Sequence, residues 1–584
     1  MVDHTTLSEF RTQLSSNILP NDHLFLQLLT LAHGKGAGKP LIRDLNLAIE
    51  ADANILLSDV VLFRQVIAAK LPLKAMQELH RGNDVYISLV ASGGYEFAVG
   101  ILAILALGAC ATLLSPAMPP GELAYYIAKS QSVMILSSGK GLKSVGQLGK
   151  QMKEQGVEVV ALPVTPASLS TAKNASSKSV SLSQIYISHN SRPSPDKPGI
   201  IIFTSGTTGP PKGVVLPRST ITTGAQSLAT QLELHTGDTL LHLLPVHHAS
   251  GVNLSFFPFL LAGACIEFKT GGFDSQWVWD RWSRGDLTHF TGVPTMYTRL
   301  MRHHEQHIVK LPLVDQRRYR EGASQIRTMF CGTSALPKTI DQFWRDVRKG
   351  IPIIQRYGST ETQIAINVPL SGWQDVPDGS IGKASVGVEV KIAGVEDDGE
   401  GELLIKSPHM FSGYLNDKEN TQKVHDENGF FRTGDIAKKE GQYFFILGRA
   451  NIDILKSGGY KISALDIERE LLALDYVDEA MVVGVGDEEF GQRVAAVVTL
   501  RKQSKDTPKK VSLDSLRSDL GTRLAGYKLP TLLRLVEGEL PKNATGKVVK
   551  KVLGPKYFPS NYSQDARVQI WQPRRSLARD NAKL

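Results

Sequence analysis

The sequence predicts an α/β fold, in which a large N-terminal domain of layered α/β subdomains precedes a small α+β domain. Up to residue 138, short apolar runs typical of buried strands alternate with stretches of helical length, which is the rhythm of α/β layers. After residue 450, an amphipathic helix precedes strand-like runs, as in a small α+β unit. We therefore expect a large domain over 1–450, a small domain over 451–559 and an exposed tail over 560–584.

The elements of the first domain are predicted from their apolar runs. Residues 84–90 and 133–136 each form a short apolar run that predicts a buried strand. The longest apolar run, 98–114, is borderline in length for a membrane span, but Gly108 divides it and Ser115-Pro116 ends it. We therefore expect a buried helix followed by a buried strand here, and no transmembrane segment.

Charge and cysteine usage restrict the function. The chain has 584 residues, with 66 Lys and Arg against 57 Asp and Glu, which gives a formal net charge of +9 at pH 7. These cations are scattered and no nucleic-acid-binding motif is present, so we expect anionic small molecules as partners and no nucleic acid. Cys110, Cys265 and Cys331 lie far apart in apolar contexts, which indicates buried thiols in a reducing compartment.

The loop that follows a strand-like run at 199–203 carries the clearest chemistry. Glycines let a backbone approach a polyphosphate, amides and hydroxyls donate hydrogen bonds to it, and a lysine neutralises its charge. The spacing of a Walker A loop is absent. A Gly- and Pro-rich hairpin turn with an exposed lysine is the alternative interpretation. The candidate phosphate-binding residues are Thr204, Ser205, Gly206, Thr207, Thr208, Gly209, Pro210, Pro211 and Lys212.

Four later segments carry residues that suit a nucleotide. In the first of them, Tyr357 offers an aromatic ring for a purine, Thr360 a hydroxyl for a phosphate and Glu361 a hard carboxylate for Mg2+. In the second, Asp435 can accept hydrogen bonds from both hydroxyls of a ribose. The segments are 355–361, 431–435, 447–461 and 541–547.

Together with the loop at 204–213, these segments resemble the signatures of the adenylate-forming superfamily, which comprises acyl-CoA synthetases, luciferases and adenylation domains. The resemblance implies the fold of that superfamily, with a small domain that moves about a hinge within 451–453. It also implies ATP and CoA as co-substrates and Mg2+ as the metal, bound by Glu361. A carboxylate would first attack ATP and release pyrophosphate, and a thiol would then take the acyl group from the adenylate.

The resemblance assigns a role to individual residues. Catalytic roles fall to Thr204, Lys212, Glu361 and Lys547, and the domain movement would remove Lys547 before the second step. ATP or AMP binding falls to the loop residues above and to Gly332, Thr333, Ser334, Arg356, Tyr357, Gly358, Ser359, Thr360, Asp435, Arg449 and Lys547. The acyl group and CoA are assigned to His248, Val293, Pro294, Arg356, Gly458 and Gly459.

Within the superfamily the chain looks closest to the malonyl-CoA synthetase branch, through residues 245–248, 292–301 and 355–358. That branch predicts malonate or a similar small carboxylic acid as the substrate, with free CoA as the acceptor. Arg356 can bind a second carboxylate of the substrate, or it can pair with a carboxylate of the protein. A fatty or pathway-specific monocarboxylate is the alternative substrate.

Two further expectations concern location and reaction class. The ending Ala582-Lys583-Leu584 is a conservative variant of the Ser-Lys-Leu peroxisomal address, which predicts recognition by the peroxisomal import receptor and otherwise a cytoplasmic location. An adenylate-only enzyme, a luciferase-like oxidase and a non-catalytic binding scaffold are the alternatives from another functional class. Intact Lys547 and Glu361 argue against a scaffold that has lost its activity.

Overall fold

The structure is a computed structural model that describes residues 6–34, 36–154, 160–166, 179–189, 191–204, 211–332, 336–394, 399–450, 452–457, 460–488, 490–501, 511–543 and 546–571. Several predicted functional residues lie outside the described residues, and their roles stay predictions. They are Ser205, Gly206, Thr207, Thr208, Gly209, Pro210, Thr333, Ser334, Gly458, Gly459, Ala582, Lys583 and Leu584.

The first sheet forms the N-terminal α/β layers. Its strand order is β20 (Gly413–Tyr414), β10 (Lys212–Pro217), β9 (Pro198–Thr204), β5 (Cys110–Leu114), β4 (Tyr86–Val90), β6 (Met134–Ser137) and β7 (Val160–Pro163). The strands from β9 to β7 run parallel, whereas β10 runs antiparallel to β9 and returns the chain from the predicted phosphate loop.

Helices cover both faces of this sheet, which is why its strands are apolar on both sides. Side chains of α3 (Ala53–Lys70) and α5 (Tyr95–Ala106) pack on one face, and those of α6 (Pro120–Ser130) and α7 (Leu142–Glu154) on the other. The prediction for 98–114 is confirmed, because α5 is buried and leads into the buried strand β5. In the part of the chain that the structure describes, no helix is long and apolar enough to cross a membrane.

A second sheet carries several of the predicted site residues. Its strand order is β17 (Lys383–Ala384), β16 (Gln363–Asn367), β15 (Ile354–Ser359), β14 (Thr328–Cys331), β13 (His289–Gly292), β11 (Thr239–His242), β12 (Cys265–Phe268), β2 (Ile42–Asp44) and β3 (Ile49–Ala51). The strands from β15 to β2 are parallel, so the segments that follow β11, β13, β14 and β15 leave from the same edge of the sheet.

Buried tryptophans hold the helices of the second sheet together. The rings of Trp279 and Trp344 stack with centroids 5.7 Å apart, and Trp282 packs against both. These residues lie in one apolar cluster with the start of the helix that follows β13. The helices of this part are α8 (Ala225–Gln231), α9 (Ala249–Val252), α10 (Phe257–Leu261), α11 (Ser275–Trp282), α12 (Pro294–Gln306), α13 (Leu313–Gln325) and α14 (Lys338–Val347).

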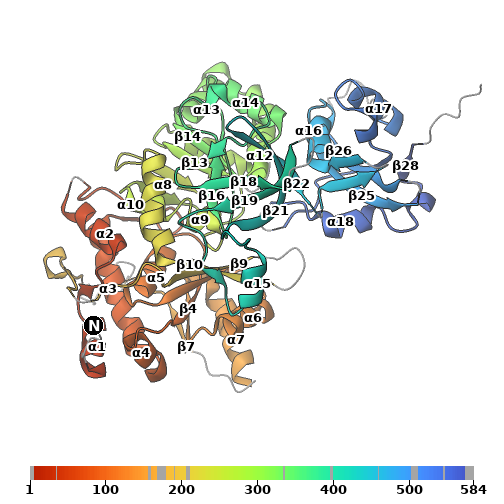
Figure 1. Ribbon diagram of the computed structural model, residues 1–584. Coiled ribbons are helices and arrows are strands. Elements are labelled where there is room, and N and C mark those ends of the chain that lie inside the picture. Colours follow the sequence, from red (N-terminus) through yellow and green to blue (C-terminus); the bar gives the residue numbers. More distant parts are fainter. Residues whose placement is uncertain are drawn as a thin grey trace, which may run out of the picture.

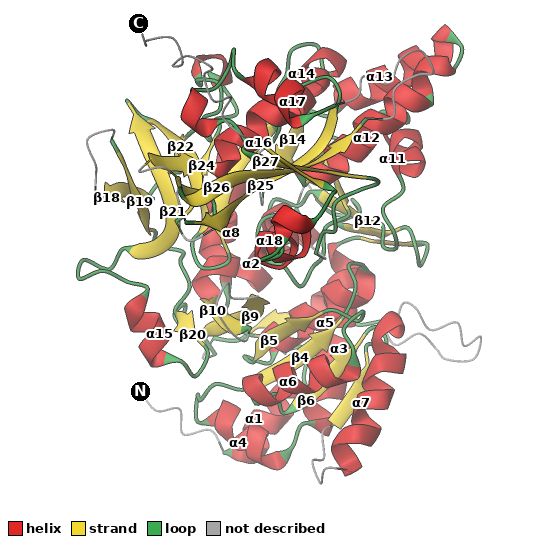
Figure 2. Cartoon of the chain, turned by 90° about the vertical axis from the view of Figure 1, so that its right-hand side faces the viewer, coloured by secondary structure: helices red, strands yellow, loops and turns green. Residues whose placement is uncertain are grey.

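An antiparallel sheet and a C-terminal unit complete the chain. The antiparallel sheet has the order β18 (Glu389–Ala393), β19 (Glu400–Lys406), β21 (Phe431–Glu440) and β22 (Tyr443–Arg449). The C-terminal sheet contains β24 (Tyr460–Ser463), β23 (Ile454–Ser457), β26 (Gly491–Leu500), β25 (Val477–Asp487), β27 (Leu532–Val536) and β28 (Val568–Ile570). Its helices are α16 (Ala464–Leu472), α17 (Leu513–Leu520) and α18 (Lys550–Tyr557). Figure 1 and Figure 2 show this unit beside β21 and β22.

The remaining elements lie near the N-terminus or on the surface. The short strands β1 (Ile18–Leu19) and β8 (Tyr186–Ile187) pair in parallel. The other helices are α1 (Leu7–Leu14), α2 (His23–His33), α4 (Leu73–His80) and α15 (Lys418–Lys423). The predicted tail is corrected at its beginning, because β28 pairs with β27 and buries Val568 in the C-terminal core. By pairing with β27, the strand β28 covers an edge that would otherwise be exposed.

Candidate active site

Asp435 is the centre of a cluster that joins three of the predicted signatures. It lies on β21 directly opposite Arg449 of β22, and Nε of Arg449 is 3.0 Å from its Oδ1. The hydroxyl of Tyr357, on β15, donates a 2.5 Å hydrogen bond to Oδ2. Burial, and then the charge of Asp435, raise the pKa of Tyr357 well above its ordinary value, so the tyrosine stays a donor. The carboxylate predicted to bind a ribose is therefore held in place through both of its oxygens.

A second cluster joins the phosphate loop to the predicted metal ligand. Thr204 and Lys212 lie opposite each other on β9 and β10, so the loop begins and ends at one place. Nζ of Lys212 is 4.7 Å from the ring centre of Tyr414, and the hydroxyl of Tyr414 donates a 3.0 Å hydrogen bond to Oε1 of Glu361. Tyr414 thus lies between the cation expected on the phosphates and the carboxylate expected on Mg2+.

The turn between β15 and β16 holds the remaining residues of the Tyr357 signature. Gly358 has no room for a side chain, because a Cβ atom there would lie 1.7 Å from the carbonyl oxygen of Gln363. The hydroxyl groups of Ser359 and Thr362 lie 3.2 Å apart, and the backbone N–H of Thr362 donates to Ser359 Oγ. These contacts fix the backbone on both sides of Thr360 and Glu361.

The predicted catalytic lysine lies in the same site. A Cβ atom on Gly546 would lie 2.8 Å from Oγ1 of Thr295, so the segment before Lys547 packs against the start of α12. Burial among protein atoms and then Arg449 lower the pKa of Lys547, whereas Asp435 raises it. The side chain nevertheless remains accessible to solvent. The C-terminal unit therefore brings its lysine near Asp435, the acid that is predicted to bind the ribose.

His248 marks the wall where the acyl group is expected. It is the N-cap residue of α9, and its ring lies 4.6 Å from that of His247. Burial and the charge of Lys547 lower the pKa of His248, and burial lowers the pKa of His247 to about 3. Both imidazoles are therefore neutral at physiological pH. Val293 caps α12 and Pro294 begins it, which places both beside the Lys547 segment.

Arg356 is a cation without an acidic partner among the residues that the structure describes. It precedes Tyr357 on β15, and its guanidinium carbon lies 4.1 Å from the ring centre of Phe330. Burial lowers the pKa of Arg356 to about 10. Its Nη1 is buried without a hydrogen bond, and no ion pair joins Arg356 to a carboxylate of the described residues. A Cβ atom on Gly332 would lie 3.3 Å from the Arg356 carbonyl oxygen, so Gly332 adjoins the same strand.

The predicted hinge segment is tied to both parts of the chain. The backbone N–H of Arg449 donates to Oδ2 of Asp453 across 3.0 Å, and Nζ of Lys550 lies 2.5 Å from Oδ1. Lys550 also lies 2.7 Å from Oε1 of Glu468 on α16. Asp453 therefore links the end of β22 to the helix that follows Lys547. The exact hinge residue stays a prediction.

Sequence reasoning missed three residues of this site, Tyr414, Phe330 and Gln363. Tyr414 lies on a two-residue edge strand, and Phe330 lies within an apolar strand that reads as core. Gln363 follows the Glu361 signature but has no motif of its own. The one local signal is Gly413, whose positive φ of 151° marks an unusual backbone before Tyr414.

Comparisons with known proteins agree with this geometry. A family model described as AMP-binding enzyme matches residues 74–415, and one described as AMP-binding enzyme C-terminal domain matches 466–547. A malonate–CoA ligase of Arabidopsis thaliana is 35% identical over 487 residues, which cover 80% of this chain and 77% of that protein. A CoA ligase of Gibberella moniliformis is 34% identical over 535 residues, which cover 81% and 85%.

Solved structures show the same likeness. MatB from Rhodopseudomonas palustris with ATP bound has a TM-score of 0.73 and 26% sequence identity, and the match covers 92% of this chain and 99% of that one. The chain therefore belongs to the AMP-binding enzymes and, within them, to the AMP-forming acid–CoA ligases. The predicted superfamily, fold class and enzyme class are confirmed.

Proposed function

We propose that this chain joins a small dicarboxylic acid, malonate or a close analogue of it, to CoA with ATP as the energy source. The observation that carries this proposal is Arg356, a partly buried cation without a carboxylate partner among the described residues. A charge in such a place needs a counter-charge, and an arginine can bind both oxygens of a carboxylate. The malonate–CoA ligases among the relatives support the same class of substrate.

In the first half-reaction, an oxygen of the substrate carboxylate attacks the α-phosphorus of ATP. The bond from that phosphorus to the bridging oxygen breaks, and pyrophosphate leaves with the electron pair. The protein mainly positions the reactants and neutralises charge. Lys212 and Lys547 would act on the phosphates, with Thr204 and Thr360 as hydroxyl donors. Asp435 would accept hydrogen bonds from the ribose, and Arg449 would hold Asp435.

The residues present fit a magnesium ion at Glu361. Its Oε1 accepts a hydrogen bond from a neutral tyrosine, and no cation of the described residues pairs with Glu361. Mg2+ prefers one or two carboxylates together with phosphate oxygens. When bound, the metal would neutralise phosphate charge during the first half-reaction. Lys212 lies over the ring of Tyr414, whose hydroxyl contacts Glu361. The lysine and the metal would therefore both act on the phosphates near Tyr414.

In the second half-reaction, the sulfur of CoA attacks the acyl carbon and AMP leaves. Lys547 has no role in this step, and rotation about residues 451–453 would remove it. His248, Val293 and Pro294 would line the acyl group, because they lie beside Lys547 in the present arrangement. Gly458 and Gly459 would border the path of the thiol.

A panel of carboxylic acids with ATP, Mg2+ and CoA, read by mass spectrometry, tests the proposal. Malonate should be converted, and Arg356→Ala should lose malonate turnover while propionate turnover stays equal or rises. The matched control is Arg320→Ala, because Arg320 forms an exposed ion pair with Asp346. If only monocarboxylates were turned over, the proposal of a dicarboxylic acid substrate would be refuted. Turnover without CoA would favour an adenylate-only enzyme or a luciferase-like oxidase.

A further inference from the structure

Gln363 has a backbone conformation that residues other than glycine rarely adopt. Its φ is +59°, in the left-handed region, at the end of the three-residue turn that joins β15 to β16. Turns of this length commonly have a glycine at that position, because only glycine adopts it without steric cost. A strained residue other than glycine persists where its side chain has a task or where its surroundings hold it.

The side chain of Gln363 makes two hydrogen bonds in opposite directions. Its Nε2 donates to the carbonyl oxygen of Thr360 across 2.6 Å. Its Oε1 accepts from Nδ2 of Asn253 across 3.0 Å. Both Gln363 and Asn253 are buried, so these bonds are shielded from water. One side chain therefore connects the turn that carries Thr360 and Glu361 to the chain directly after α9.

The two ends of this connection belong to different walls of the active site. Asn253 follows α9, whose N-cap residue is His248, and its backbone N–H donates to the carbonyl oxygen of Ala249. Glu361 is held separately, because its carbonyl oxygen accepts from the backbone N–H of Phe411 and its carboxylate from Tyr414. Gln363 thus links the wall expected to hold the acyl group to the turn expected to hold phosphate and metal.

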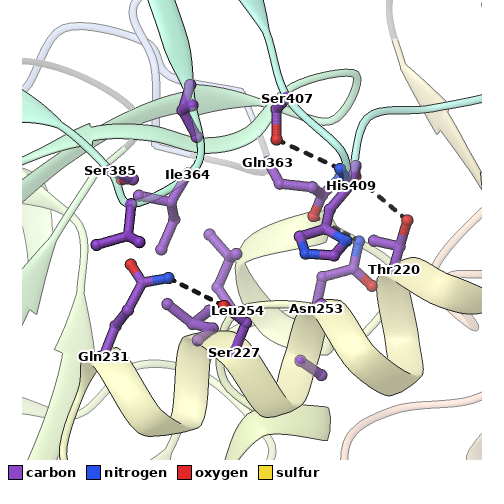
Figure 3. A pocket seen from close by; sticks show the side chains of 15 residues that line it. Thr220, Ser227, Gln231, Asn253, Leu254, Gln363, Ile364, Ser385, Ser407 and His409 are labelled. Atoms are coloured by element: carbon purple, nitrogen blue, oxygen red, sulfur yellow. Dashed lines mark hydrogen bonds between the residues drawn. The ribbon is translucent and has the colours of Figure 1, made fainter.

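A pocket borders the hydrogen bond between Gln363 and Asn253. Its volume is about 50 Å3, and Gln363, Asn253, Ile364 and His409 are among its lining residues. Figure 3 shows Gln363 and Asn253 directed toward each other at one wall. Because Gln363 borders this pocket, neighbouring side chains do not enclose it on every side, and its two hydrogen bonds help to fix its orientation.

We infer that Gln363 is a positioning residue for adenylate formation, which sets the position of Thr360 and Glu361 relative to the acyl wall. The inference rests on the proposed function, in which these two residues act on phosphate and metal. The two hydrogen bonds of Gln363 would then fix the separation between the substrate carboxylate and the charged phosphates. A displacement of about 1 Å in such an arrangement can lower the rate about a hundredfold.

Two substitutions separate positioning from stability. Gln363→Gly removes both hydrogen bonds and also the backbone strain, whereas Gln363→Met removes the bonds and keeps the strain. We expect both variants to lower kcat of pyrophosphate release at least tenfold and to require more Mg2+ for half-maximal rate. The melting temperature should be unchanged or higher for the glycine variant. Ser227→Ala is the matched control, because Ser227 lines the same pocket and its hydroxyl accepts a hydrogen bond from Nε2 of Gln231.

The affinity for ATP with Mg2+, measured by titration calorimetry, is the second readout, because it needs no acid substrate. It should fall in both Gln363 variants and stay unchanged in the control. A glycine variant with normal kcat, Mg2+ requirement and ATP affinity would overturn the inference. If the glycine variant lost both melting temperature and activity, Gln363 would be a structural residue, and the inference would be overturned as well. Wild-type protein that binds ATP but turns over no acid would refute the proposed function alone.

Discussion

The hydroxyl of Tyr357 donates a 2.5 Å hydrogen bond to the carboxylate of Asp435, which joins two segments that are far apart in the sequence. The same carboxylate pairs with Arg449, so it lies between two donors. A ribose would present its hydroxyls to this carboxylate as further hydrogen-bond donors.

Substitution Asp435→Asn should therefore weaken ATP binding. The amide keeps one acceptor oxygen and loses the charge that holds Arg449, and charged hydrogen bonds are roughly twice as strong as neutral ones. We expect KM for ATP to rise about tenfold, which corresponds to about 1.4 kcal/mol. Initial rates of pyrophosphate release against ATP concentration measure it. Asp378→Asn, in an exposed pair with Lys338, is the control and should leave KM unchanged.

Lys547→Ala should separate the two half-reactions. The amine comes from the C-terminal unit and lies near enough to Asp435 and Arg449 for their charges to act on it, so its loss would remove a positive charge from the phosphates of ATP. We expect pyrophosphate release to fall at least a hundredfold, whereas the reaction of supplied acyl-AMP with CoA continues at close to the normal rate. Lys556→Ala, at an exposed position of α18, is the control. Equal loss of both half-reactions would contradict the removal of Lys547 between the steps.

The pH dependence of adenylate formation should report the same amine. Burial and Arg449 lower the pKa of Lys547 below the ordinary value of 10.5, so the amine loses its proton at a lower pH than a free lysine does. The protonated amine is the form that neutralises phosphate, and the rate should therefore fall as pH rises through this lowered pKa. Lys547→Arg keeps its charge at these pH values and should lose this fall. A wild-type rate that stays constant up to the ordinary lysine pKa would contradict this assignment.

The fold could be predicted in large part because its signals are local. Hydrophobic runs reveal buried strands, and Gly108 with Ser115-Pro116 divides a run of membrane length into α5 and β5. The strand β28 is harder to predict, because it is only three residues long. A strand of that length has no periodicity that a sequence can display.

The site could be predicted where residue type alone restricts the chemistry. Lys547, Asp435 and Arg449 belong to recognisable segments, and the structure brings them together. Tyr414 and Gln363 could not be predicted, because their roles depend on which atoms of distant segments lie within hydrogen-bond reach. Among the described residues, no carboxylate pairs with Arg356, and this is likewise a property of packing that no spacing in the sequence reveals.

Arg302 should favour the arrangement in which adenylate formation occurs. It lies on α12 of the large domain and binds Asp478 of the C-terminal unit, with Glu479 and Glu539 each 3.8 Å away. Arg299 of the same helix pairs with Glu539 across 3.0 Å. The Lys547 segment packs against the start of this helix, so these contacts hold the lysine in the site. A movement that removes Lys547 would have to break them.

Arg302→Glu should therefore slow pyrophosphate release several-fold, because three acidic side chains would repel the new charge. An ion pair at such a site contributes about 1 kcal/mol. The reaction of supplied acyl-AMP with CoA should be unchanged or faster, since it needs the other arrangement. Added salt should slow wild-type adenylate formation more than that of the variant, because salt screens the attraction. Arg345→Glu, which disturbs an ion pair within α14, is the control. Equal slowing of both half-reactions would show that Arg302 supports the fold and has no preference between the two arrangements.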